Sequence, residues 1–277
     1  MNSSISKSQV DAVPNEESMR VGSLERILLL LPIAGGLVFG LFPFLLGGAF
    51  GKLLGFSGDD SFIYRLAGAA TLGYAVALIM GLRLGDWAPL RLVVIGTMAF
   101  NLASIYACVA QLVAGDTNLI IYLILGTSIA ITAITLWMLN RHPSGMQMQS
   151  ELSTWYIRFI TLGTVLSGVF GLMPLFTPVL GSHLLGFHGT DVFLIRQAGA
   201  ASLGYAVIGI LVVRSGGAWL EIRLPLVMAL IFNGFSFVAS VIALFSAEPV
   251  LITVVIGAAS LFVTIVGMIA YQRQGRL

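Results

Sequence analysis

Eight long apolar segments constrain the fold of this chain more than any other feature of its sequence. Each is about as long as the ~20 residues that an α-helix needs to cross the hydrocarbon core of a membrane. Each is apolar throughout, whereas the strands of membrane β-barrels alternate polar and apolar residues over about 10 positions. The sequence therefore predicts an all-α, polytopic integral membrane protein with eight transmembrane helices. The predicted spans are residues 27–50, 62–84, 90–113, 118–139, 155–179, 193–213, 224–245 and 250–271.

The composition agrees with a lipid environment and argues against nucleic-acid binding. Hydrophobic residues make up 58% of the 277-residue chain and charged residues only 9%, whereas a soluble domain carries about 25% charged residues. The formal net charge of +2 is too small for the basic surface that binds nucleic acid. We therefore expect the lipid bilayer as the main partner, membrane-protein subunits as candidate further partners, and no nucleic acid.

The distribution of Lys and Arg predicts which end of the bundle faces the cytoplasm, because these residues concentrate in cytoplasmic loops. One end holds three of the 14, namely Lys52, Arg65 and Arg196. The other end holds Lys7, Arg20, Arg26, Arg83, Arg91, Arg141, Arg158, Arg214, Arg223, Arg273 and Arg276. This bias predicts a cell-membrane protein with both termini in the cytoplasm.

The second half of the chain repeats the first. Residues 53–76 read LLGFSGDDSFIYRLAGAATLGYAV, and residues 184–207 read LLGFHGTDVFLIRQAGAASLGYAV, an offset of 131 positions. After a one-residue insertion near Gly216 the match continues, so that Asn101 corresponds to Asn233. Four spans return the chain to its starting side of the membrane. The sequence therefore predicts two parallel four-helix repeats related by a pseudo-twofold axis along the membrane normal.

This organisation divides the chain into four parts. Residues 1–26 are polar and are expected to form a disordered cytoplasmic tail. Residues 27–139 form the first predicted membrane repeat, and residues 155–277 form the second. Residues 140–154 are polar, contain Pro and Gly, and are expected to link the repeats in the cytoplasm.

Two further residue pairs carry expectations about the ends of the helices. Trp87 and Trp219 are expected to anchor the bundle at the cytoplasmic interface, where tryptophan is enriched in membrane proteins. Pro43 and Pro174 lie near the outer ends of the first and fifth spans. They are expected to kink or end those helices, because proline removes a backbone donor.

The repeated motif places a carboxylate and an arginine at the outer end of the second helix of each half. Asp60 and Asp191 stand at helix N-cap positions, where a carboxylate accepts hydrogen bonds from free backbone N–H groups. Arg65 and Arg196 are positioned to extend outward to these carboxylates. Two interpretations stay open. One is a cap with an interfacial ion pair, and the other is a site for an anion or a lipid headgroup, because positive charge is disfavoured on this side.

Small residues follow the arginines in both copies of the motif. Ala69 and Gly73 are four positions apart, as are Ala200 and Gly204. This spacing lets helix backbones approach closely in lipid. We therefore expect the second and sixth spans to lie at the centre of the bundle, against each other.

Polar side chains near the middle of the membrane are the other repeated feature. Tyr74 and Asn101 in the first half correspond to Tyr205 and Asn233 in the second. An unpaired phenol or amide in hydrocarbon costs several kcal/mol, so we expect the tyrosine and asparagine of each half to bond to each other or to a nearby hydroxyl. The alternative is that they line a cavity for a small ligand. Further hydroxyls suit either interpretation: Ser128, Thr132, Ser260 and Thr264.

The chain shows no constellation typical of catalysis or of a cofactor site. Its single cysteine, Cys108, lies within an apolar segment. His183 and His188 share one loop without further metal ligands nearby, so no metal site is expected. No nucleophile–base motif and no phosphate-binding glycine loop occurs. We therefore expect no catalytic residue and no cofactor.

The pattern LLGF-G-D-F--R-AGAA-LGYA in each half resembles that of small bacterial DoxX-like membrane proteins. The resemblance covers each half separately and implies a four-helix architecture, without assigning a role to any residue. Two functions remain open from the sequence. The first is a non-catalytic accessory or scaffold protein of the membrane. The second is a binding or transport protein for a small molecule, an anion or a lipid, with a site that opens to the extracytoplasmic face.

Overall fold

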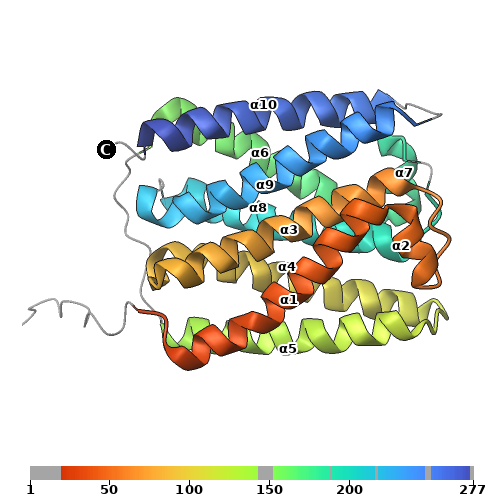
Figure 1. Ribbon diagram of the computed structural model, residues 1–277, viewed down its shortest axis with the longest axis horizontal. Helices are drawn as coiled ribbons and strands as arrows, with labels where there is room; N and C mark the ends of the chain where they lie inside the picture. The colour runs from red at the N-terminus through yellow and green to blue at the C-terminus, as the bar shows by residue number, and fades with distance from the viewer. Residues whose placement is uncertain (1–19, 143–151, 188, 216–217, 247–250, 275–277) are drawn as a thin grey trace, which may run out of the picture.

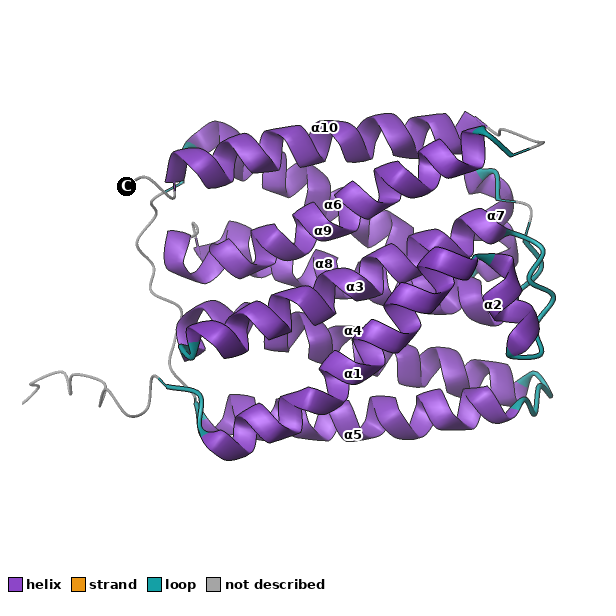
Figure 2. Ribbon diagram, in the orientation of Figure 1, coloured by secondary structure: helices purple, strands orange, loops and turns teal. Residues whose placement is uncertain are grey.

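The structure, a computed structural model, is a bundle of α-helices (Figures 1 and 2). It describes residues 20–142, 152–187, 189–215, 218–246 and 251–274. In these ranges the helices are α1 (Ser23–Leu46), α2 (Gly48–Leu53), α3 (Ser61–Leu84), α4 (Trp87–Val113), α5 (Leu119–Arg141), α6 (Thr154–Phe176), α7 (Pro178–Leu185), α8 (Val192–Ser215), α9 (Trp219–Leu244) and α10 (Leu251–Gln274).

Eight helices in the described part of the chain are long and apolar enough to cross a membrane. The mean hydropathy of their most apolar windows lies between 1.5 and 2.4. The remaining two, α2 and α7, are only 6 and 8 residues long. The predicted all-α, multi-pass membrane architecture with eight spanning helices is therefore confirmed.

The middle of the bundle is formed by α3, α4, α8 and α9, and the other long helices cover it (Figure 1). α1 packs on α3, α6 on α8, α5 on α4 and α10 on α9. Within the middle, α3 packs mainly on α9, and α8 mainly on α4, so the two halves of the chain interlock. α3 and α8 also contact each other, and α3 is the most enclosed span, with 72% of its window buried. The central position expected for these two helices is confirmed.

Glycines at corresponding positions let the covering helices approach the middle closely. A Cβ atom on Gly68 of α3 would lie 2.7 Å from the backbone nitrogen of Phe44 in α1. A Cβ atom on Gly199 of α8 would lie 2.7 Å from the carbonyl oxygen of Gly171 in α6. Backbone atoms cannot move aside as a flexible side chain can. Glycine is therefore required at both helix crossings.

The first and fifth spans end earlier than the sequence predicts, because each is followed by a short helix. α1 ends at Leu46, three residues after Pro43, and Gly47 adopts a positive φ of 54° while its N–H donates to the Pro43 carbonyl oxygen at 2.9 Å. α6 ends at Phe176, two residues after Pro174. The expected effect of the two prolines on these helices is thus observed, whereas the short helices α2 and α7 were not predicted.

At the other end of the bundle, α1 begins at Ser23, before the predicted start of its span. Val21 donates its N–H to the carbonyl oxygen of Gly85 at 2.9 Å, which ties the chain before α1 to the loop before α4. Residues 1–19 of the predicted tail and residues 143–151 of the predicted linker lie outside the described residues.

Candidate functional site

Tyr74 of α3 and Tyr205 of α8 each donate a hydrogen bond into the other half of the chain. Tyr74 Oη donates to the carbonyl oxygen of Ala201 at 2.8 Å, and Tyr205 Oη donates to that of Ala70 at 2.9 Å. The two rings contact each other edge to face, with their centroids 5.0 Å apart. Both the donors and the acceptors are 131 positions apart in the sequence. The two bonds are therefore equivalent under the sequence repeat.

Glycine makes this exchange possible. A Cβ atom on Gly73 would fall on the hydroxyl of Tyr205, and one on Gly204 would fall on the hydroxyl of Tyr74. The small residues that the sequence assigned to helix packing thus also provide the space in which each tyrosine reaches the opposite backbone.

The tyrosines do not bond to the asparagines, so this part of the sequence prediction was wrong. Asn101 donates its Nδ2 to the carbonyl oxygen of Thr97 at 2.8 Å, and Asn233 donates to that of Ala229 at 2.8 Å. Each asparagine therefore uses one N–H of its side-chain amide within its own helix, on the carbonyl at position i−4. The physical reason is that backbone carbonyl oxygens serve as acceptors for both side chains, that of the opposite half for each tyrosine and that of its own helix for each asparagine.

The first half contains a cavity of about 160 Å³ between α1, α3, α4 and α5. Its walls are mainly aliphatic and aromatic. Its polar lining groups come from α3, α4, α5 and α8 and are Tyr64, Thr71, Tyr74, Thr97, Asn101, Ser104, Thr127, Ser128 and Gln197. Ser128 and Ser104 share a hydrogen bond of 3.0 Å between their hydroxyls.

The second half contains a larger cavity of about 520 Å³ between α6, α8, α9 and α10. Five of its polar lining groups occupy the positions that correspond to lining residues of the first cavity: Ser202, Tyr205, Asn233, Ser236 and Ser260. Its wall also includes residues that are half exposed on the outside of α6 and α10, such as Leu162 (57%) and Phe262 (58%). This cavity therefore reaches the outer surface between α6 and α10.

The two copies of the repeated aspartate have different roles, at the end of the bundle where α2 and α7 lie. Asp60 caps α3 as predicted, accepting from the backbone N–H groups of Phe62 and Ile63 at 3.0 and 3.1 Å. The carboxylate of Asp191 instead accepts bonds from the first half of the chain.

The donors to Asp191 lie in and after the loop that precedes α3. Ser57 N–H donates to one carboxylate oxygen at 2.8 Å, and Gly58 N–H (2.8 Å) and Tyr64 Oη (2.7 Å) donate to the other. Among the described residues, its side chain makes no bond to the first turn of α8. The predicted capping role of Asp191 is corrected accordingly: this carboxylate joins the two halves.

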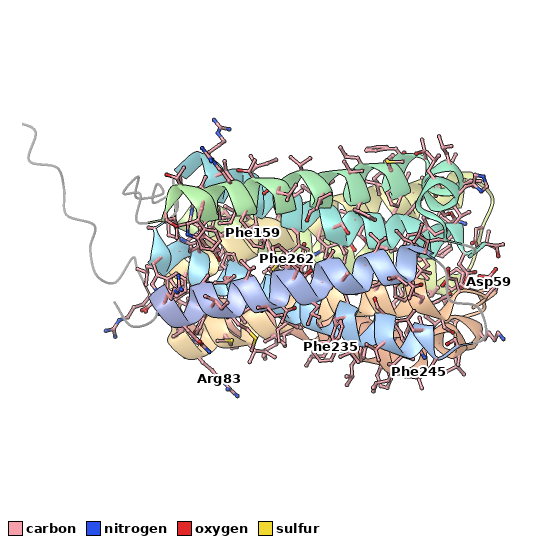
Figure 3. All side chains as sticks on the ribbon, turned by 90° about the horizontal axis from the view of Figure 1, so that it is seen from above. Asp59, Arg83, Phe159, Phe235, Phe245 and Phe262 are labelled. Atoms are coloured by element: carbon pink, nitrogen blue, oxygen red, sulfur yellow. The ribbon has the colours of Figure 1, made fainter. Side chains whose placement is uncertain are left out.

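A second contact joins the same two loops near the surface. The carboxylate of Asp59 accepts hydrogen bonds from the backbone N–H and the hydroxyl of Thr190. Partial desolvation by itself would raise the pKa of Asp59, but the hydrogen bonds from Thr190 and Ser57 outweigh it and lower the pKa below the usual value of an aspartate. Figure 3 shows Asp59 at one end of the bundle and Arg83 at the other.

The repeated arginines are not paired with the repeated aspartates. No ion pair between them occurs in the described part of the chain, and Arg196 donates instead to the side-chain oxygen of Gln111 at 2.7 Å. The guanidinium of Arg65 lies beside Gly47 at the end of α1. Neither arginine lines either cavity. Of the predicted site residues, the tyrosines and asparagines line the two cavities. The repeated aspartates and arginines line neither cavity.

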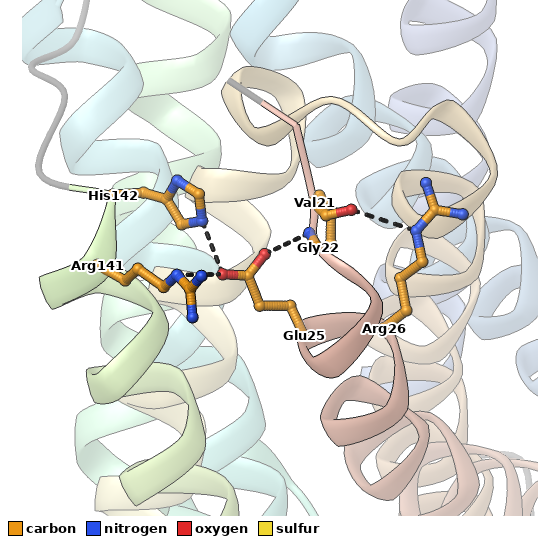
Figure 4. A network of polar contacts seen from close by, with 6 residues as sticks. All are labelled: Val21, Gly22, Glu25, Arg26, Arg141 and His142. Carbon is orange, nitrogen blue, oxygen red and sulfur yellow. Dashed lines mark hydrogen bonds and ion pairs between the residues drawn. The ribbon is translucent and has the colours of Figure 1, made fainter. Parts of the chain in front are cut away.

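A buried polar cluster at the opposite end of the bundle was not predicted (Figure 4). Glu25, which is 1% exposed, accepts from Gly22 N–H at 2.7 Å, contacts His142 Nε2 at 2.8 Å and pairs with Arg141 at 3.5 Å. The cluster connects the start of α1 to the end of α5. The sequence placed Glu25 and His142 in a tail and a linker. The position of Glu25 three residues after Gly22, typical of a helix N-terminus, was the available signal.

Trp87 belongs to this cluster, which corrects the expectation that it anchors the bundle in the interface. Its side chain is 1% exposed and stacks on the His142 ring, with centroids 4.7 Å apart. Trp219, at the corresponding position, contacts Tyr271 instead, with centroids 5.6 Å apart.

The described residues contain no group of three or more His, Cys, Asp or Glu side chains placed to hold a metal ion. His188 lies outside the described residues, so the prediction about its loop stays a prediction. Comparisons with protein-family models, with curated proteins and with solved structures give no match.

Proposed function

We propose that this chain is a non-catalytic membrane protein that binds small amphiphilic molecules from the bilayer, in cavities formed by its two halves. A small-molecule or lipid site is the function that the two cavities support best. Sites of this kind are concave and mainly apolar, with a few convergent polar groups. The competing interpretation is an accessory or scaffold role, which requires no bound ligand.

The observation that carries the proposal is the agreement between the two cavities. Tyr74, Asn101 and Ser104 line the first cavity, and the residues at the corresponding positions line the second. Buried polar groups cost free energy in hydrocarbon unless they are hydrogen-bonded. Tyr74, Asn101 and Ser104 each make a bond within the protein, and the cavity beside them leaves room for further bonds to a ligand. A cavity with the same polar groups in both halves is better explained by binding than by loose packing.

The lining supports an uncharged ligand. Neither cavity is lined by Asp, Glu, Lys or Arg, and a charged group placed in hydrocarbon without a partner is strongly disfavoured. The anion site considered from the sequence is therefore not part of the proposal. The half-exposed lining residues of α6 and α10 favour entry from the lipid rather than from the extracytoplasmic face.

We further propose that the chain consists of two parallel four-helix repeats in the cell membrane, with both termini in the cytoplasm. The reciprocal bonds of Tyr74 and Tyr205 support a pseudo-twofold relation between the halves. The excess of Lys and Arg at one end supports the orientation. Partner subunits are not required by this proposal.

A photoactivatable analogue of dodecanol, with a diazirine in its alkyl chain, tests the binding function. The purified protein in lipid nanodiscs is irradiated with increasing probe, and the labelled residues are located by mass spectrometry. Saturable labelling of cavity-lining residues such as Asn101 or Phe232, competed by unlabelled dodecanol, is the expected result. Non-saturable labelling confined to outer residues such as Leu37 and Tyr122 would reject it and favour the scaffold role.

Single cysteines test the orientation of the repeats, in a Cys108→Ser background. Lys52→Cys and His183→Cys are corresponding positions at one end, and Arg83→Cys and Arg214→Cys are corresponding positions at the other. A membrane-impermeant maleimide should label the first pair in intact cells and the second pair only after permeabilisation. Labelling of Lys52→Cys and His183→Cys from opposite sides would rule out parallel repeats.

A further inference from the structure

We infer that the second half holds the principal ligand site and that it takes an amphiphile with an uncharged hydroxyl headgroup, bound at Ser236. This inference rests on the proposed binding function and assigns it to one cavity, one polar group and one class of ligand. Three differences between the corresponding cavities carry it.

The first difference is the state of two serines. In the first half, the hydroxyls of Ser104 and Ser128 bond to each other at 3.0 Å. The corresponding hydroxyl of Ser236 is buried, with the residue 1% exposed, and has no hydrogen-bond partner among the described residues. Ser260, at the position that corresponds to Ser128, lines the same cavity. The two serines that share a hydrogen bond in the first half are therefore not bonded to each other in the second.

An unpartnered hydroxyl in hydrocarbon is costly. Leaving a buried donor or acceptor unsatisfied costs about 1–3 kcal/mol. A ligand hydroxyl placed between Ser236 and Ser260 would satisfy it, both as donor and as acceptor.

The second difference is volume. The cavity in the second half measures about 520 Å³ and that in the first about 160 Å³. Lining residues of the first cavity are replaced at the corresponding positions by smaller ones: Leu78 by Gly209, Thr97 by Ala229 and Thr127 by Ala259. Only the larger volume lies within the range of about 300–1,000 Å³ that is usual for small-molecule sites.

The third difference is an aromatic pair between the two covering helices of the second half. Phe159 of α6 and Phe262 of α10 both line the second cavity and contact each other edge to face, with centroids 6.0 Å apart. Their positions on the ribbon are labelled in Figure 3. The corresponding residues of the first half are Leu28 and Ala130. This aromatic pair gives an alkyl chain an apolar surface to pack on between α6 and α10, while the headgroup lies deeper in the cavity.

The chemistry of the polar wall specifies the headgroup. Asn233 lines this cavity and uses its Nδ2 within its own helix, so its side-chain oxygen is the group that a ligand donor would use. A hydroxyl can donate to that oxygen and also exchange bonds with the serines, whereas a carboxylate cannot donate and would place a charge in hydrocarbon. Long-chain alcohols and monoacylglycerols belong to the class that fits.

The test uses the photoactivatable dodecanol on the full-length protein in nanodiscs, with two matched variants. Ser236→Ala removes the unpartnered hydroxyl, and Ser104→Ala removes its counterpart in the first half. We expect Ser236→Ala to weaken saturable labelling about tenfold, as the loss of one buried hydrogen bond implies, and Ser104→Ala to change it less than twofold. Labelling of wild type should be competed by dodecanol but not by dodecanoate.

A second pair of variants exchanges a lining residue between the halves. Ala229→Thr should reduce labelling, because it places the first-half side chain in the second cavity, whereas Thr97→Ala should not. Size-exclusion profiles and unfolding midpoints establish that all four variants fold. If wild type is labelled saturably but Ser104→Ala weakens labelling as much as Ser236→Ala does, this inference is overturned and the binding function stands. If wild type shows no saturable labelling, both are overturned.

Discussion

Tyr74 and Tyr205 contact each other edge to face while each donates its hydroxyl proton to the helix that carries the other. This pair is the point at which the two halves of the chain are most symmetrically joined. The bonded carbonyls already accept within their helices, so the tyrosines add second bonds to helical carbonyl groups and determine how α3 and α8 are aligned along each other.

The first prediction concerns these hydroxyls. Tyr74→Phe and Tyr205→Phe should each lower the free energy of unfolding by about 0.6 kcal/mol, the average measured for interhelical bonds in membranes, and by no more than about 1.7 kcal/mol. Because the rings touch, the effects of the two substitutions should not be additive. Reversible unfolding in mixed micelles measures the change. Tyr106→Phe, on a half-exposed tyrosine outside this contact, is the control and should be neutral.

The second prediction concerns the glycines opposite the tyrosines. Gly73→Ala and Gly204→Ala place a methyl group on a tyrosine hydroxyl, and overpacking of this kind costs about 1–3 kcal/mol. Gly126→Ala and Gly234→Ala are matched controls, since a Cβ atom at either helical position meets nothing within 4 Å. The controls should be neutral or slightly stabilising. Equal effects at all four positions would show that helix propensity alone matters.

Much of this arrangement followed from the sequence. The eight spans, the central place of 62–84 and 193–213 and the role of small residues all depend on hydrophobicity and local spacing, which a sequence shows directly. The partners of the tyrosines did not follow. When two helices carry nearly the same residues, local pattern does not show whether a side chain bonds within its own half or across to the other.

The two aspartates illustrate the same limit. The sequences around Asp60 and Asp191 are alike, so the same role was expected of both, yet only Asp60 caps its own helix. The donors to Asp191 stand 127 to 134 positions away. The cluster around Glu25 was missed for a related reason, because a polar residue beside an apolar run looks exposed until a distant segment covers it.

The third prediction uses this difference between the aspartates. Asp191→Asn should lower the free energy of unfolding by about 1–3 kcal/mol, because the amide brings a donor to positions where two N–H groups and a hydroxyl already donate. Asp60→Asn should be almost neutral, since asparagine caps a helix about as well as aspartate. Both are measured as changes in the unfolding equilibrium at neutral pH. Comparable losses in the two variants would contradict the assigned roles.

The fourth prediction concerns pH. The pKa of Asp59 is lower in the folded protein than in the unfolded chain, so its carboxylate stabilises the fold fully above the unfolded value of about 3.9. This stabilisation is lost as the pH falls through the lower, folded value. The unfolding midpoint of wild type should therefore drop more steeply below about pH 4 than that of Asp59→Asn. Parallel curves for the two proteins would show that the contact with Thr190 contributes nothing.

The fifth prediction concerns the buried carboxylate at the other end of the bundle. Glu25 is 1% exposed and meets His142 and Arg141, whereas the side chain of Arg141 is 58% exposed. Removing the buried partner, as in Glu25→Ala, should cost about 3–5 kcal/mol, because it leaves the groups that face the carboxylate without their acceptor. Arg141→Ala removes a solvent-screened ion pair and an exposed contact of the guanidinium with the Trp137 ring, and should cost about 1 kcal/mol. Unfolding equilibria and the near-ultraviolet signal of Trp87, which stacks on His142, would report both. A small effect of Glu25→Ala with an unchanged Trp87 signal would show that the cluster does not hold α1 to α5.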